Sequence, residues 1–287
     1  GAVEGAVGAA VIEPLIYRAK YLEQAEYDMA DSLLNIALGA GVGATVQPLA
    51  GAVADAVRGV RGREAPWVRA EREGRFAAAG VPHRVAFWLA PGAPAFDTTA
   101  FLSTIRRGVE AATAMMGDIP YREYTFLYVD GVGGGLEHLN STTIGVSAAR
   151  LAQDPAAAVG VTVHEFFHLW NVKRLRPVEL GPFDFENEVY TRSLWLAEGV
   201  TSYYGPLAMT RAGVSSETNF LASMSGAINL LQSTPGRLVH PVESASFDAW
   251  IKLYRPNENS ANTTISYYVK GAVIGFLLDA RIRKLTN

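Results

Sequence analysis

His164, Glu165 and His168 form an HExxH pattern, in which two imidazoles lie four residues apart and a carboxylate follows the first. On an α-helix this spacing places both histidines on one face, where they can bind a single Zn²⁺. A catalytic zinc keeps one coordination position for water, and a nearby carboxylate can take that water's proton as it attacks a carbonyl. The pattern therefore predicts metal-assisted hydrolysis, with His164 and His168 as ligands and Glu165 as the base.

The sequence around this motif favours a metal site over a purely structural role. Asp154-Pro155 is typical of a helix start, with an acid at the N-cap and proline at the first helical position. Residues 156–170 are mostly apolar and contain no proline, so we expect them to form a buried helix. Two histidines and a glutamate buried there without a ligand would cost several kcal/mol.

A third ligand is available in residues 193–204, an apolar stretch that carries a single acid, Glu198. We expect a second helix there, and with the two histidines Glu198 completes a three-ligand site for one zinc per chain. Ser202, four residues later, is a candidate for orienting a ligand. Residues 171–192 are rich in charge and contain two prolines, so we expect a loop that reverses the chain between the helices.

Three segments resemble the glycyl aminopeptidase family of bacterial zinc metallopeptidases: HEFFHLWNVKRLRP, LWLAEGVTSYY and ISYYVKGAVIGFLLDARIR. Members are gluzincins with a thermolysin-like catalytic domain, often followed by a PDZ domain. The resemblance implies an α+β catalytic domain over residues 81–287, with an N-terminal β-sheet part followed by a mostly helical part. Residues 1–80 are left as an N-terminal segment of uncertain fold and a linker.

The resemblance also implies a substrate-binding role for Glu137. Residues 133–138, GGGLEH, are similar to the Gly-x-Met-Glu-Asn strand of the wider gluzincin aminopeptidases, where the glutamate binds the substrate's α-ammonium. Gly134 and Gly135 then let the backbone lie close to the peptide. His138 stands where the broader pattern has asparagine. The alternative is a glycine turn with an ordinary surface acid.

Tyr268 lies in Tyr-Val-Lys-Gly, which resembles the element whose phenol donates a hydrogen bond to the oxyanion in those aminopeptidases. Tyr267 is the alternative donor, and both tyrosines could instead be packing residues. The family implies hydrolysis of the N-terminal residue, with small first residues such as glycine or alanine preferred, from peptides with a free amino terminus. A zinc endopeptidase and an inactive, metal-free binding or scaffold protein of the same fold are the alternatives.

The remaining pattern is that of strands followed by helices, which indicates an α+β domain. The expected strands are 83–90, 123–130 and an edge strand at 136–146, and the expected further helices are 98–116, 217–232 and 266–283. The net charge of -3, with signs mixed along the chain, indicates no nucleic-acid surface. The chain has no cysteine, which excludes disulfides and thiolate metal sites.

The N-terminal quarter gives weaker signals. Residues 32–54 are uncharged and long enough to span a membrane, but Asn35, Gln47, Pro48 and several glycines make a poor transmembrane helix. An intramembrane metalloprotease is disfavoured as well, because the uncharged residues 156–163 before the motif are only half a span. Residues 58–75 read as a charged linker.

The sequence does not decide the compartment or the oligomeric state. No signal peptide is visible in this chain, and for a bacterial protein both periplasm and cytoplasm stay open. The chain stops within an expected helix and shows no PDZ sequence, so we expect it to be a piece of a longer protein.

Overall fold

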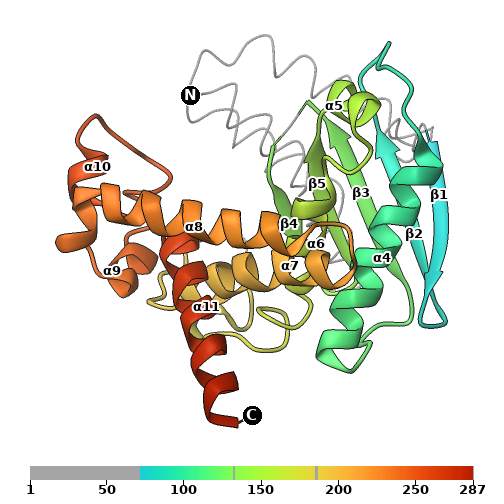
Figure 1. The fold of residues 1–287 in the computed structure, drawn as a ribbon. Helices are drawn as coiled ribbons and strands as arrows, with labels where there is room; N and C mark the ends of the chain where they lie inside the picture. Colours follow the sequence, from blue (N-terminus) through green and yellow to red (C-terminus); the bar gives the residue numbers. More distant parts are fainter. Residues whose placement is uncertain (1–71, 132, 185–186, 287) are drawn as a thin grey trace. The chain divides into compact units, whose positions relative to one another are not determined.

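A computed structural model describes residues 72–131, 133–184 and 187–286 (Figure 1). The chain divides into two compact units, residues 1–73 and residues 74–287. The boundary therefore falls at 73/74 rather than at the expected 80/81, because most of strand β1 (Arg72–Ala78) belongs to the second unit. Residues 72–75 of the expected linker are strand. The other predictions for residues 1–71 lie outside the described residues.

The second unit contains a five-stranded sheet with the order β1-β2-β3-β5-β4. A two-residue turn at Ala79 and Gly80, both with positive φ, joins β1 to β2, as is usual for a tight hairpin. The next three strands in the sheet pair in parallel, and β4 pairs antiparallel with β5 at the edge. Their bounds are β2 (Val81–Trp88), β3 (Tyr124–Asp130), β4 (Gly135–Glu137) and β5 (Ser141–Val146). The edge strand expected at 136–146 is thus two strands.

One face of the sheet carries the main hydrophobic core. Phe87, Tyr128 and Ile144 are fully buried in neighbouring strands and lie in the same cluster as residues of the covering helices. These helices are α4 (Thr98–Met116) and α6 (Val159–Phe167). The predicted bounds of α4 are confirmed, because its end signals are local: the Asp97 carboxylate accepts a hydrogen bond from the amide of Ala100, and Gly117 ends the helix at φ 75°.

The metal-motif helix α6 begins later than the sequence predicts. Asp154 is not its N-cap, since the Asp154 amide donates to the carbonyl of Arg150 and so ends the preceding helix, α5 (Ala148–Gln153). The carboxylate of Asp154 accepts from the amide of Ala156, 2.9 Å away, in a separate turn. The regular helix then starts at Val159, without a side-chain cap.

The rest of the unit is mainly helical, which confirms the predicted α+β class. In Figure 1, α7 lies between α6 and α11, and α8 packs across α11. The elements are η2 (Val178–Leu180), the π-helix η3 (Trp195–Gly199), α7 (Val200–Arg211), α8 (Glu217–Ser233), η4 (Pro235–Leu238), α9 (Val242–Phe247), α10 (Ser260–Thr263) and α11 (Tyr267–Thr286). Within the described ranges, no helix is both long enough and apolar enough to cross a bilayer.

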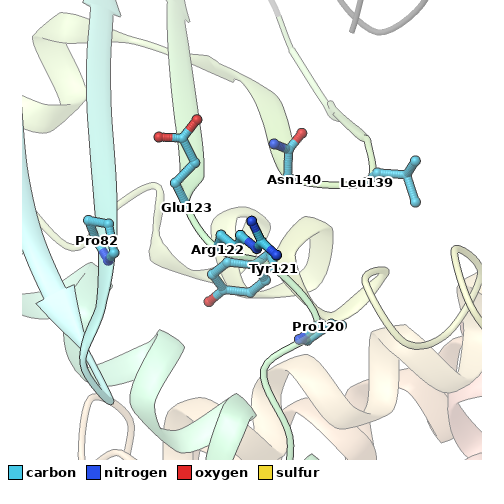
Figure 2. Close-up of a pocket in the computed structure, with 7 residues that line it drawn as sticks. All are labelled: Pro82, Pro120, Tyr121, Arg122, Glu123, Leu139 and Asn140. Carbon is cyan, nitrogen blue, oxygen red and sulfur yellow. The ribbon is translucent and has the colours of Figure 1, made fainter. Parts of the chain in front are cut away.

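A hollow of about 660 Å³ opens where β2 and β3 begin, beside the turn that joins β4 to β5 (Figure 2). Its walls are Pro82, Pro120, Tyr121, Arg122, Glu123, Leu139 and Asn140. This lining includes none of the residues that the HExxH motif or the family resemblance singled out. The hollow therefore gives no evidence about where the predicted site lies.

Candidate metal centre and active site

The helix that carries the HExxH motif is fixed on two sides. On the sheet side, the hydroxyls of Thr162 and Tyr128 lie 2.8 Å apart within the core. On the other side α7 approaches closely, since a Cβ added to Gly205 would lie 3.5 Å from the backbone of His164. Beyond the helix, the indole of Trp170 donates to the carboxylate of Asp118 at 2.6 Å. These contacts fix the direction in which the motif's histidines project.

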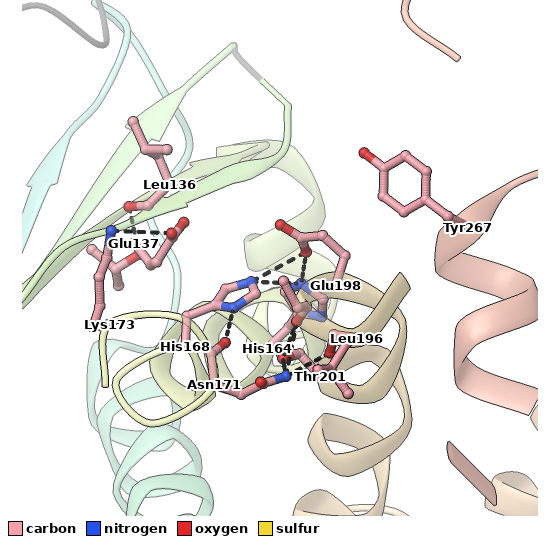
Figure 3. Close-up of polar contacts among 12 residues, drawn as sticks. Leu136, Glu137, His164, His168, Asn171, Lys173, Leu196, Glu198, Thr201 and Tyr267 are labelled. Atoms are coloured by element: carbon pink, nitrogen blue, oxygen red, sulfur yellow. Dashed lines mark hydrogen bonds and ion pairs between the residues drawn. The ribbon is translucent and has the colours of Figure 1, made fainter. Parts of the chain in front are cut away.

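The structure brings the three predicted ligands together (Figure 3). Glu198 Oε2 lies 3.1 Å from His164 Nε2 and 3.2 Å from His168 Nε2, and the two nitrogens are 3.2 Å apart. Ligand atoms placed about 2.0–2.2 Å from a tetrahedral zinc would be separated by about 3.3–3.6 Å, close to the observed distances. Two imidazole nitrogens and one carboxylate oxygen at this spacing therefore fit a zinc ion.

The protonation of these groups suits metal binding. The Nδ1 of His168 donates to the backbone carbonyl of Asn171 at 2.8 Å, which directs Nε2 toward the other two ligands. Burial lowers the pKa of His168, but the carboxylates of Glu198 and Glu137 outweigh it and raise this pKa to about 10, so a bound metal would take the place of the proton on Nε2. Burial acts to raise the pKa of Glu198, but the imidazoles of His168 and His164 outweigh it and bring this pKa to about 2. Glu198 is therefore a carboxylate at neutral pH.

Asn171 connects the two segments that supply the ligands. Its side-chain amide donates to the carbonyls of Leu196 and Ala197, at 2.8 and 3.0 Å, and to the hydroxyl of Thr201 at 3.0 Å. Leu196 and Ala197 lie in the π-helix η3, whose wider turn is often found at functional sites. The hydroxyl in this network belongs to Thr201 rather than to Ser202. The role of Asn171 was not predicted, although Asn171 lies within the family motif.

Two glycines let α11 approach the segment that carries Glu198. A Cβ added to Gly199 would lie 2.4 Å from the Cα of Gly271, and one added to Gly271 would lie 2.5 Å from the carbonyl oxygen of Trp195. No real Cβ fits at these distances, so the two backbones pack directly on each other. This contact explains in physical terms why a glycine follows Glu198 and another lies three residues after Tyr268.

Glu165, the predicted base, is enclosed between the metal ligands and strand β4. It is 7% exposed, and a Cβ added to Gly135 would lie 2.5 Å from its Oε1. The space beside Gly135 is thus taken by Glu165, whereas Gly134, at φ 78°, has open space at the equivalent position. Burial raises the pKa of Glu165 to about 8; the carboxylates of Glu137 and Glu198 add to this rise and His168 opposes it.

Glu137 faces the same site, but it has a partner that the sequence did not reveal. Its Oε1 lies 3.1 Å from the Nζ of Lys173, and both side chains are largely enclosed. Oxygen and nitrogen atoms of Glu137, Glu165 and His168 lie within 4.8 Å of one another, so Glu137 borders the metal centre. In the sequence Lys173 is one of several basic residues in the loop that follows the motif, and only the fold shows that its side chain points inward.

The two candidate tyrosines stack on each other beside the metal centre, with ring centroids 4.7 Å apart. The ring of Tyr268 is half-buried and its centroid lies 6.4 Å from that of His164. Tyr267 is fully buried and its hydroxyl lies 3.0 Å from that of Tyr254; in Figure 3 it projects from α11 toward the side of Glu198. Burial raises the pKa of both phenols, so both remain protonated donors.

Comparison with known proteins identifies the domain. The family model described as M61 glycyl aminopeptidase matches residues 157–274, which include the metal ligands and both tyrosines. A crystal structure of an aminopeptidase N family protein from Idiomarina loihiensis aligns with a TM-score of 0.69 and 32% identity, over 74% of this chain and 37% of that protein. The chain belongs to the M61 glycyl aminopeptidase family. This M61 peptidase domain has the predicted thermolysin-like α+β fold.

Two other solved structures align less closely with this M61 domain. Yeast LTA4 hydrolase in complex with bestatin gives a TM-score of 0.45 at 17% identity, over 72% of this chain and 30% of that protein. An M1 zinc metallopeptidase from Deinococcus radiodurans, bound to a Tyr-Ser-Ala substrate, gives 0.43 at 15% identity, over 70% and 38%. No curated protein matches the chain. The chain thus spans 30–38% of the length of these three solved structures.

Proposed function

We propose that this domain is a zinc-dependent aminopeptidase that removes the N-terminal residue from peptides. The observation that carries this proposal is the convergence of His164, His168 and Glu198 at 3.1–3.2 Å, with Glu165 beside them. These three side chains would hold one zinc per chain. When bound, zinc supplies Lewis-acid chemistry, polarising the scissile carbonyl and making a nearby water more acidic.

Glu165 is the proposed general base. It follows His164 directly in α6, and Gly135 leaves it the space it occupies against β4. Its enclosed carboxylate has a pKa raised by burial, which strengthens it as a proton acceptor. Glu165 takes the proton of the attacking water and then passes it to the amine that leaves when the peptide bond breaks.

Tyr268 is the proposed donor to the oxyanion that forms on the scissile carbonyl. Its ring is half-buried and its centroid lies 6.4 Å from that of His164, whereas Tyr267 is fully buried. The hydroxyl of Tyr254 interacts with both phenols, so exposure and the position beside His164 are what distinguish Tyr268. A donor of this kind contributes about 2.7–4 kcal/mol to transition-state stability. We therefore assign the role to Tyr268 and a supporting, packing role to Tyr267.

Glu137 is the proposed anchor for the substrate's α-ammonium. Its position beside Glu165 and His168 sets a short distance between a bound amino terminus and the reacting carbonyl. The open space at Gly134 leaves room for the substrate backbone. A preference for glycine or alanine as the first residue follows from the family alone. A zinc endopeptidase is the second candidate, because the ion pair with Lys173 already gives Glu137 a cation.

The metal assignment is tested by quantifying zinc and turnover together. We expect one zinc per wild-type chain and loss of most of it in the His168→Ala variant. Glu165→Gln should keep the metal and lose nearly all turnover, because Glu165 transfers protons and is not a ligand. Full zinc retention by His168→Ala, or loss of zinc from Glu165→Gln, would overturn these roles.

The amino-terminal preference is tested with glycyl anilide and N-acetylglycyl anilide. Blocking the amine removes a charged hydrogen bond of about 1.5–3 kcal/mol to Glu137, so the blocked substrate should react at least tenfold more slowly. Glu137→Ala should abolish most of this difference. Equal cleavage of both substrates by the wild type, or cleavage of internal bonds only, would favour the endopeptidase.

A further inference from the structure

Lys173 is a buried cation at the proposed amino-terminus site. The exposed fraction of its side chain is 5%, and its Nζ lies 3.1 Å from Glu137 Oε1 (Figure 3). On another side, Nζ lies 4.1 Å from the ring centroid of Phe183, a favourable cation–π distance. The backbone amide of Lys173 donates to the carbonyl of His168 at 2.9 Å. Lys173 is therefore fixed from both ends, by the metal helix and by the aromatic ring.

Lys173 is the cation in direct contact with Glu137, and the more distant imidazole of His168 also lowers the pKa of this carboxyl. The neighbouring His138 is 5% exposed, and its pKa is lowered to about 4, first by burial and then by Lys173, so it is neutral. Arg174 follows Lys173 in the sequence but points to the exposed surface, where it pairs with Asp118. Lys173 thus keeps a direct ion pair with Glu137 that neither neighbour replaces.

This ion pair lowers the free-energy penalty for binding a substrate whose amine is blocked. A buried carboxylate that loses every partner carries a large desolvation penalty. While Lys173 holds Oε1, Glu137 stays paired whether or not an ammonium reaches its second oxygen. A substrate with an acylated or absent amine therefore lacks one charged hydrogen bond, but it does not leave the carboxylate of Glu137 unpaired.

We propose that Lys173 is a specificity-determining residue that limits the selectivity for a free amino terminus. The proposal rests on the proposed function, in which Glu137 binds the α-ammonium. It predicts measurable activity on N-acylated peptides, and it makes the degree of selectivity a property of the Glu137–Lys173 pair. The class of additional substrate is a small peptide whose first amine is acylated or otherwise uncharged.

The experiment compares kcat/KM for glycyl anilide with kcat/KM for N-acetylglycyl anilide, in zinc-loaded protein. In Lys173→Met the ratio of the two values should rise about tenfold above the wild-type ratio, because the blocked substrate now leaves Glu137 unpaired. Lys173→Arg, which keeps the charge, should stay near the wild-type ratio. Arg174→Met is the matched control, since it removes an adjacent cation from the exposed surface and should leave the ratio unchanged.

The outcomes separate this proposal from the proposed function. A Lys173→Met ratio equal to or below that of the wild type, at full zinc content, would refute the role of Lys173 while the aminopeptidase assignment stands. A wild-type ratio of one would overturn the aminopeptidase assignment itself, and this inference with it. If Lys173→Met does not fold, Lys173→Gln removes the same charge but keeps a polar side chain. The same rise in the ratio of the two kcat/KM values is expected for it.

Discussion

Replacing Asn171 with alanine removes the amide that joins the end of the metal helix to the π-helix carrying Glu198. The two N–H groups of this amide are lost, which three acceptors share: the carbonyls of Leu196 and Ala197 and the hydroxyl of Thr201. The bond from His168 Nδ1 is to the Asn171 backbone carbonyl, so it survives the substitution. The perturbation therefore acts on the position of Glu198 rather than on the histidines.

The size of the effect follows from these contacts. In the variant the Thr201 hydroxyl still donates to the carbonyl of Ala197 at 2.6 Å. The carbonyl of Leu196 is therefore the acceptor that loses most when the Asn171 donor is removed. We expect a loss of about 2 kcal/mol of unfolding free energy in zinc-free protein, at about 1 kcal/mol for each net bond lost. Zinc affinity should fall about 10–100-fold, as is usual when a group that orients a ligand is removed.

The assay is chelator competition for zinc, combined with urea unfolding of the zinc-free protein. Asn219→Ala is the control, because Asn219 lies exposed on α8 and should change neither quantity appreciably. A zinc affinity in Asn171→Ala within twofold of the wild type would refute the argument that Asn171 positions Glu198. A fall in stability with unchanged zinc affinity would have the same meaning.

Two further predictions concern packing and pH. Gly271→Ala should strongly destabilise the protein and lower activity, because the added Cβ would lie 2.5 Å from the carbonyl oxygen of Trp195. The control is Gly226→Ala, exposed on α8 with nothing within 4 Å of the added Cβ, which should be neutral or stabilising. Equal melting temperatures of the two variants would contradict this prediction. His83 has its pKa lowered to about 4 by burial, against 6.5 when unfolded, so its contribution to stability is complete above pH 6.5 and is lost as pH falls toward 4. Between pH 7 and pH 5 the zinc-free wild type should therefore lose about 2 kcal/mol more than His83→Gln in urea unfolding, and identical losses would show that His83 titrates normally.

The parts of the fold that the sequence predicted well are those with local signals. The bounds of α4 follow from an aspartate cap at one end and a glycine at the other. The start of α6 was wrong because the same kind of signal, at Asp154, ends one helix instead of beginning the next. A residue of this type indicates that a helix begins or ends nearby. Only the hydrogen bonds on each side of it show whether it ends the preceding helix or begins the next one.

The predicted metal ligands come together because two of them are fixed by helical spacing, and a metal site then needs a third. Asn171 and Lys173 were missed because their roles depend on contacts across the fold, with the π-helix and with β4. Spacing along one element can be read from the sequence. The direction in which a loop side chain points depends on what packs against it, and no pattern in residues 171–192 carries that information.

His164, His168 and Glu198 are the three residues that we propose hold the zinc. Crystals of zinc-loaded protein, measured at the zinc absorption edge, locate the metal directly. We expect one anomalous peak, about 2.0–2.2 Å from the Nε2 atoms of both histidines and from a carboxylate oxygen of Glu198. A competing group of Glu137, Glu165 and His168 lies beside it. A peak centred on that second group, or no peak at zinc saturation, would show that these three residues do not form the zinc site.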